Sequence, residues 1–260
     1  MPSLLPEILD LVLDHLRNDP TSLKACCTVS KRWVSHARAH LFALVEFSRG
    51  FSIESWMRVF PDPSNSPAHH TRHLSIEASR TFPTSMDAHA WIHSFCNVVK
   101  LEVNTIWYDD SQTSFAPLHA FSPALKSLSL TYSSPPPFEV FNLICSFPSL
   151  EDLSLFSFAQ NEPEGGWAVP STSPKLTGTL QFSAHWARIR PDVCRLLDLP
   201  GGLHFSCISI SCLMEDIECT RDLVLRCSDT LESLSIGCHS PGGFPSASVI
   251  DLSFTHCPLI

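Results

Sequence analysis

The sequence predicts an α/β chain in which a small all-α unit of three helices precedes an irregular solenoid. The solenoid is expected to have a curved parallel sheet with helices on its outer side. Two observations lead to this prediction: the first 45 residues carry helical apolar spacing with helix-start signals, and from there a hydrophobic pattern returns about every 27 residues. Residues 46–73 are expected to be a linker or extended first turn, and residues 74–260 to form about seven repeats.

Apolar residues in the first segment recur at helical spacing. One face of the first predicted helix carries Leu5, Ile8, Leu9, Val12, Leu13 and Leu16. Pro6 suits the first turn of a helix, and Glu7 lies near the positive end of its dipole. Asp19 can cap a second helix that starts at Pro20, and Ser30 can cap a third. Three short helices enclose a very small core, so the unit is expected to need a partner or an attached domain.

Several stretches of this segment occur in a familiar order. They are Leu5-Pro6-Glu7-Ile8-Leu9, Val12-Leu13-Asp14-His15-Leu16, Leu23-Lys24-Ala25-Cys26-Cys27, Val29-Ser30-Lys31-Arg32-Trp33 and Ala37-Arg38-Ala39-His40-Leu41-Phe42. In this order and spacing, residues 1–45 resemble the F-box, in the form common in fungal F-box proteins. Thr28 departs from the family, many of whose members have an apolar residue there.

The resemblance implies a partner for the first segment. F-boxes bind the Skp-family adaptor and, through it, a cullin ubiquitin ligase. The residues that would contact the adaptor here are Leu5, Pro6, Ile8, Leu9, Leu23 and Trp33. The surplus apolar side chains agree with this, because a helical hairpin of this kind fills a groove on a partner. The alternative is that these residues form only the core of a small helical cap on the solenoid.

The second segment repeats an apolar residue, two spacers, an apolar residue, one spacer and an apolar residue. The pattern is clear in Leu125-Leu128-Leu130, Leu150-Leu153-Leu155 and Leu231-Leu234-Ile236. The central positions are 74, 101, 128, 153, 180, 208, 234 and 252, and the steps between them are 27, 27, 25, 27, 28, 26 and 18. All but the last step fall in the range typical of leucine-rich repeats. Each repeat is therefore expected to contain a strand, a turn, a helix and a return.

Helices are expected between these strands, at residues 87–95, 138–147, 191–199 and 214–227. The asparagine or cysteine that usually follows the central leucine of a leucine-rich repeat by five residues is mostly missing, so the solenoid should be irregular. Since the final step is only 18 residues, either the last repeat is truncated or the last strand is an exposed sheet edge.

Charge and cysteine usage restrict the class of protein. The net charge is −9, with a balance of about +1 in residues 1–45 and about −10 in the remainder. This argues against nucleic-acid binding and favours separate units with separate partners. No apolar run approaches the roughly 18 residues of a membrane helix. The 11 cysteines are odd in number and include no CxxC pair, which favours reduced thiols and a cytoplasmic or nuclear location.

The sequence contains no motif that predicts catalysis. It has no GxSxG elbow and no glycine-rich phosphate loop, so the expectation is a protein without enzymatic activity or a cofactor. Two histidine groups are candidate metal ligands: His69, His70 and His73, and the pair His89 and His93. Because neither group has carboxylates or thiolates at the spacing of a closed site, a histidine-rich linker and packing beside Trp91 are preferred, and no metal site is expected.

The spacers of the predicted strands should face away from the core and offer a surface to a target protein. The proposed target-binding residues are Glu102, Asn104, Ser129, Thr131, Ser154, Phe156, Gln181, Ser209 and Ser235. Alternatives are the loops at 107–115 and 162–167, or a merely soluble sheet face. The expected function is a substrate-recognition subunit of a Skp–cullin–F-box ubiquitin ligase with an unknown target. The alternative is a repeat-based interaction scaffold with no role in ubiquitin transfer.

Overall fold

The computed structural model describes residues 6–48, 51–77, 91–105, 118–119, 121, 123–132, 137–157, 173–184, 189–239 and 248–253. Its helices are α1 (Pro6–Leu16), α2 (Pro20–Val29), α3 (Lys31–Leu41), α4 (Ile53–Val59), α6 (Pro137–Cys145), α7 (Arg190–Leu197) and α8 (Ile217–Arg226). Short 3₁₀ helices are η1 (Pro63–Asn65), η2 (Pro67–His70) and η4 (Met214–Asp216). The strands are β1 (Leu44–Phe47), β2 (His73–Glu77), β3 (Lys100–Thr105), β4 (Ser127–Tyr132), β5 (Asp152–Ser157), β6 (Thr179–Ala184), β7 (Cys207–Leu213), β8 (Ser233–His239) and β9 (Ser248–Ser253).

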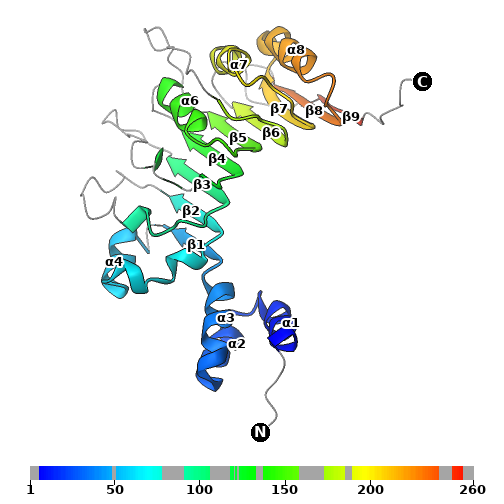
Figure 1. The fold of residues 1–260 in the computed structure, drawn as a ribbon. Helices are drawn as coiled ribbons and strands as arrows, with labels where there is room; N and C mark the ends of the chain where they lie inside the picture. Colours follow the sequence, from blue (N-terminus) through cyan, green and yellow to red (C-terminus); the bar gives the residue numbers. More distant parts are fainter. Residues whose placement is uncertain are drawn as a thin grey trace.

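All of these strands form one sheet in chain order, and β1 to β8 run parallel (Figure 1). The register aligns the predicted central residues Leu74, Leu101, Leu128, Leu153, Leu180, Ile208 and Leu234 in one row. Helices α6, α7 and α8 lie on one side of the sheet (Figure 1). The prediction of a solenoid-like α/β architecture is therefore confirmed, as are the helices near 138–147, 191–199 and 214–227.

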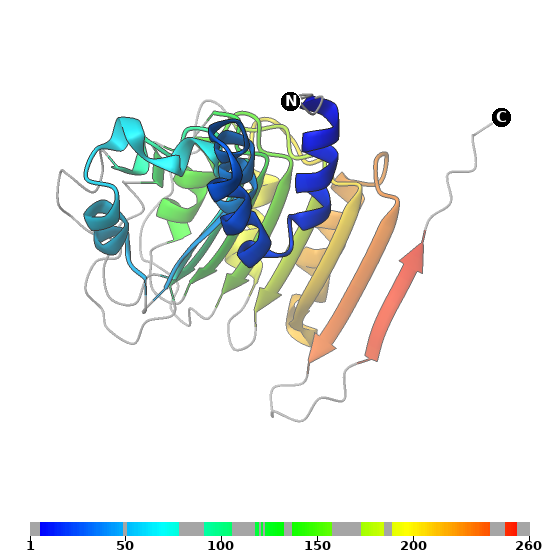
Figure 2. The same cartoon turned by 90° about the horizontal axis from the view of Figure 1, so that it is seen from below.

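The last strand differs from the prediction of a wholly parallel sheet. β9 pairs antiparallel with β8, with Leu252 opposite Leu234 (Figure 2). The reason is the short final step of the repeat pattern. A parallel return requires a crossover of about a dozen or more residues, whereas only residues 240–247 separate β8 from β9.

Residues 46–73, expected to be a linker or extended first turn, contain α4, η1 and η2 in the part that the structure describes. The array also starts earlier than predicted, at β1. Val45 and Phe47 of β1 lie in the core of the array together with Trp56 of α4. Neither element is predicted from the sequence, because β1 has only four residues and α4 only seven, too few to show a hydrophobic period.

Most of the parallel strands start from the same backbone turn. The carbonyl of the residue before one strand accepts two N–H groups from the start of the next: the oxygen of Lys126, for example, accepts from Glu151 and Asp152 at 2.8 and 2.9 Å. The carbonyls of Ala43, Arg72, Val99 and Ser206 accept in the same way. Because backbone groups make this turn, it recurs with different side chains and requires no asparagine ladder.

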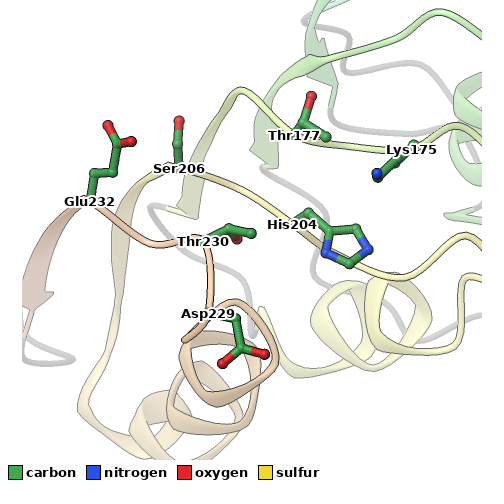
Figure 3. Close-up of a pocket in the computed structure, with 7 residues that line it drawn as sticks. All are labelled: Lys175, Thr177, His204, Ser206, Asp229, Thr230 and Glu232. Carbon is green, nitrogen blue, oxygen red and sulfur yellow. The ribbon is translucent and has the colours of Figure 1, made fainter. Parts of the chain in front are cut away.

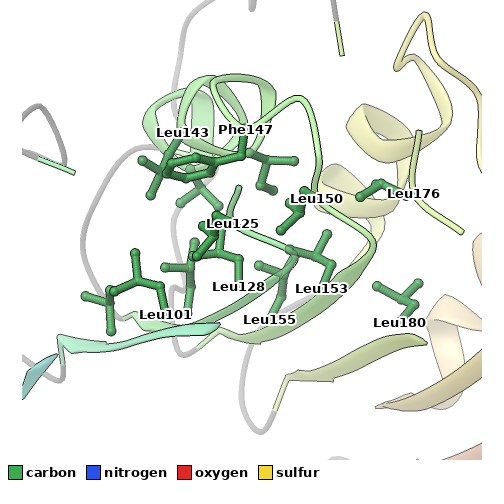
Figure 4. Close-up of a cluster of buried hydrophobic side chains, with 14 of the residues drawn as sticks. Leu101, Leu125, Leu128, Leu143, Phe147, Leu150, Leu153, Leu155, Leu176 and Leu180 are labelled. Carbon is green, nitrogen blue, oxygen red and sulfur yellow. The ribbon is translucent and has the colours of Figure 1, made fainter. Parts of the chain in front are cut away.

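The core of the array is a continuous apolar layer between the sheet and its helices. Leu128 and Leu153 project from the sheet toward Leu143 and Phe147 of the α6 region, and Leu180 continues the same row in the next repeat (Figure 4). All five side chains are buried. At the N-terminal end the layer is aromatic: the ring of Trp56 lies 5.4–6.2 Å from those of Phe42, Phe47, Phe51 and Phe95, and its Nε1 donates to Ser66 Oγ at 3.2 Å. Phe42 follows α3 directly, so this cluster joins the helical unit to the array.

The three N-terminal helices have a core of their own, separate from that of the array. It consists of Leu9, Leu13, Leu23, Cys26 and Ala37. The predicted restart at Pro20 is confirmed, since Asp19 Oδ1 accepts from the N–H groups of Thr21 and Ser22, both at 3.1 Å. Ser30 precedes α3 but makes no capping hydrogen bond with its side chain, contrary to its predicted role.

Candidate functional site

An exposed apolar stripe runs along α1. Ile8, Leu11 and Val12, which we call the α1 stripe, are 45%, 59% and 39% exposed. They lie three and four residues apart, so they share a helix face, and the buried Leu9 and Leu13 lie on another. The helix thus has two apolar faces, and only one of them is covered by the unit's own core. Val29, at the end of α2, is also exposed, at 65%.

The residues expected to contact the adaptor fall into different environments. Ile8 is exposed, Leu9 and Leu23 are buried, and Trp33 packs partly buried against the same small core. Pro6 starts α1, and Leu5 lies outside the described residues. Apolar spacing in a sequence cannot distinguish a face that meets its own core from one that meets a partner. Leu11 was missed because it lies off the single face that the spacing emphasised.

Two imidazole–carboxylate pairs join α3 to α1 beside the α1 stripe. Nδ1 of His36 lies 2.7 Å from Oδ1 of Asp10, and Nε2 of His40 lies 3.7 Å from Oδ1 of Asp14. In each helix the two partners are four residues apart, so the pairs stack along the interface. They link α1 to α3 at the surface of the unit, where such exposed pairs contribute little to stability.

The second candidate surface is the face of the sheet opposite α6, α7 and α8, which we call the open face (Figure 1). The strand register brings all nine predicted target-binding residues onto it. One row contains Glu102, Ser129, Ser154, Gln181, Ser209 and Ser235, and a second contains Asn104, Thr131 and Phe156. From β4 onward most side chains on this face are serine and threonine. The surface therefore offers hydrogen-bonding groups with Phe156 as a half-buried aromatic exception.

Charge on the open face gathers at its N-terminal end. Oε1 of Glu102 accepts from Lys100 Nζ at 2.7 Å and lies 3.2 Å from Nε2 of His73. Partial burial raises the pKa of Glu102, but the Lys100 ammonium and the His73 imidazole outweigh it, so the pKa lies below the ordinary glutamate value. Glu102 is therefore an anion already neutralised by its neighbours. His73, a candidate metal ligand from the sequence, takes part in this network.

A polar hollow of about 380 Å³ opens where β6, β7 and β8 begin (Figure 3). Its ionisable lining residues are Lys175, His204, Asp229 and Glu232, and its hydroxyl groups come from Thr177, Ser206 and Thr230. These residues come from three successive repeats, so no local sequence motif predicts that they lie together. Aligning the turns of successive repeats, for example Thr177 with His204 at a distance of 27 residues, is the signal that would have found them.

The described cysteines are all free thiols. Burial raises the pKa of Cys145 to about 11, and burial with the neighbouring Cys238 raises that of Cys212 to about 12. Such thiols stay protonated at neutral pH and are poor nucleophiles.

Within the described part of the chain, no three His, Cys, Asp or Glu side chains are grouped to hold a metal ion. The rings of His69 and His70 lie 4.0 Å apart, and His89 is outside the described residues, as are loops 107–115 and 162–167.

The fold and these surfaces define a class: a solenoid-like α/β protein that carries a separate three-helix unit with exposed apolar surface. A scan against protein-family models finds no match for the chain. A search among curated proteins likewise finds no relative. No helix in the described ranges has both the length and the apolar character needed to cross a bilayer.

Proposed function

We propose that this protein is a substrate-recognition subunit of a Skp–cullin–F-box ubiquitin ligase. Residues 1–45 would act as an F-box that binds the Skp-family adaptor, and the repeats would form a leucine-rich-repeat solenoid that binds a target protein. The protein would work in the cytoplasm or nucleus and have no catalytic activity of its own. It would accelerate ubiquitin transfer by holding a target lysine near the ligase, which raises the effective concentration.

The observation that carries the proposal is the α1 stripe. A surface of three neighbouring apolar side chains on a helix is the kind of feature that fills a hydrophobic groove on a partner. It lies on a unit whose sequence resembles the F-box and whose core is distinct from that of the array. The spacing of 25–28 residues between the aligned central residues supports the leucine-rich-repeat interpretation of the array.

The test is a quantitative pull-down of the full chain with a purified Skp-family adaptor. Ile8→Asp and Leu11→Asp should each weaken binding at least about tenfold, because burying such a side chain contributes roughly 1.5–3 kcal/mol. The matched control is Leu225→Asp on α8, since Leu225 is 57% exposed and Leu11 59%. The control should bind normally. A companion variant, Leu5→Ala with Pro6→Ala, tests the start of the F-box-like motif.

The alternative function is an interaction scaffold without a ligase role. The burial of Leu9 and Leu23 inside the unit favours it, because two residues expected to meet the adaptor are already in use. A scaffold predicts that the adaptor does not co-purify with the chain at all. If the adaptor bound the two α1 variants as tightly as the original chain, our assignment of the binding surface would be wrong.

A further inference from the structure

The walls of the polar hollow at the starts of β6, β7 and β8 are held by hydrogen bonds that do not involve its charged groups. Ser206 Oγ donates to the carbonyl of Gly178 at 3.3 Å, and Thr230 Oγ1 lies 3.2 Å from the carbonyls of Phe205 and Cys227. The N–H of Glu232 donates to the carbonyl of Ser206 at 2.7 Å. The backbone of the hollow is thus fixed before any ligand arrives, which lowers the entropic cost of binding.

The charged groups of the hollow are separated by sign. Lys175 and His204 lie on one side, and Asp229 and Glu232 lie on the other (Figure 3). Among the described residues, these four side chains have no ion-pair or hydrogen-bond partner. Elsewhere at this end of the sheet, side chains of opposite charge pair when they are adjacent, so the separation in the hollow is not a general property of these turns.

The same turn in an earlier repeat shows such a pair. Glu151 and Glu232 occupy equivalent places, since the N–H of each donates to the carbonyl that precedes the neighbouring strand. Glu151 faces Lys126, and Lys126 Nζ lies 2.8 Å from its Oε1. Glu232 faces Ser206 instead, so no cation occupies the equivalent place beside it among the residues that the structure describes. Within the described ranges, the hollow therefore presents acidic side chains without a cationic partner opposite basic side chains without an anionic partner.

We propose that this hollow binds a short extended peptide segment with one acidic and one basic side chain on the same side. In an extended peptide, side chains two positions apart project in the same direction. The carboxylate of the segment would meet Lys175 and His204, and its ammonium or guanidinium group would meet Asp229 and Glu232. Thr177, Ser206 and Thr230 would supply hydrogen bonds to the peptide backbone between them. This binding site is separate from the open face and does not depend on adaptor binding.

The test uses the full chain and a fluorescein-labelled probe of sequence Gly-Ser-Asp-Ser-Arg-Ser-Gly, with binding measured by fluorescence anisotropy. Two further probes replace Asp by Asn or Arg by Gln. The original chain should bind the doubly charged probe most tightly. Each charge removed from the probe should weaken binding about two- to fivefold, which is the size expected for exposed ion pairs.

Protein variants identify which wall meets which charge. Lys175→Gln should abolish the preference for Asp over Asn and keep the preference for Arg over Gln, and Asp229→Asn should do the reverse. Lys24→Gln and Glu54→Gln are exposed, matched charge changes at the other end of the molecule and should alter neither preference. Equal effects of the hollow and control variants, or equal binding of all three probes, would overturn the proposal. Ile8→Asp should leave probe binding unchanged, which separates this result from that of the adaptor experiment.

Discussion

The N-terminal helical unit and the repeat array bury their apolar side chains in different ways. The helical unit has a core of five buried residues, whereas 43 described residues form the continuous core of the array. A repeat buries its apolar face against its neighbours, so the array gains core with every repeat. The helical unit has no neighbour of its own kind and leaves the α1 stripe uncovered. The comparison teaches that the region with the smaller core leaves neighbouring apolar side chains exposed along one helix, although a large core does not prevent such exposure, since Met214, Ile217 and Leu225 of the array are exposed too.

The largest effect should come from deleting a core side chain in each region. Leu13 and Leu128 are both fully buried, and Leu→Ala substitutions at such positions cost about 2–5 kcal/mol. In the helical unit, Leu13→Ala removes a large share of a five-residue core and should unfold residues 6–41 locally. In the array, Leu128→Ala should lower the stability of neighbouring repeats without dissolving the fold. Hydrogen exchange measured segment by segment distinguishes these results.

The two variants also act as controls for each other. Since the two cores share no residue, Leu13→Ala should leave exchange in β4 and β5 unchanged. Loss of protection across the whole chain in Leu13→Ala would show that the two regions unfold together and that the contrast between them is false.

A smaller effect is expected from replacing one glycine of the array, Gly178. A Cβ atom at Gly178 would collide with the carboxylate of Asp152, whose Oδ1 accepts the N–H of Thr179 at 2.7 Å. Gly178→Ala should displace that carboxylate and destabilise the array by about 1–3 kcal/mol, the cost of losing a hydrogen bond to a charged group. Chemical denaturation measures the difference. The control is Gly237→Ala on β8, where the new Cβ would make ordinary contacts at 3.9 Å and stability should be unchanged or slightly higher.

The smallest effect should come from removing an aspartate that caps a helix, Asp19 in the helical unit or Asp62 in the array. Asp19 and Asp62 each accept hydrogen bonds from a serine side chain and its N–H, and these bonds hold both pKa values below the ordinary 3.8. A carboxyl group whose pKa is lower in the folded state stabilises the fold at pH values above its ordinary pKa. This stabilisation is lost as the pH falls through the folded-state pKa. Asp19→Ala should therefore weaken protection of α2 near neutral pH, and its difference from the original chain should vanish in acid.

Asp62→Ala provides the matched comparison for this acid dependence. Asp62 caps η1, a 3₁₀ turn of three residues with no buried side chain, so its loss should leave segment-resolved hydrogen exchange of the array unchanged. An equal loss of protection around both aspartates would mean that the small core of the helical unit does not make it more sensitive than the array.

Sequence reasoning succeeded where a pattern extends over many residues. The central leucines at steps of 25–28 predicted the strand register from β2 to β8, because residues in the same phase of successive repeats must stack. It failed where elements are short or pairing direction matters. β1 and α4 were not predicted as elements, because residues 46–73 were expected only as a linker or extended first turn, and β9 was expected to run parallel. The residues expected to contact the adaptor included Leu9 and Leu23, which are buried, and did not include Leu11, which is exposed.

What the sequence by itself determined is the order of the two regions, the period of the repeats and the identity of the spacers that form the open face. Those features depend on local spacing, which the chain carries along its length. Only the tertiary structure decided that α1 has a second, exposed apolar face, and that Lys175, His204, Asp229 and Glu232 line one hollow. The physical reason is that burial and charge pairing depend on which residues distant in sequence become neighbours, and local spacing does not specify those neighbours.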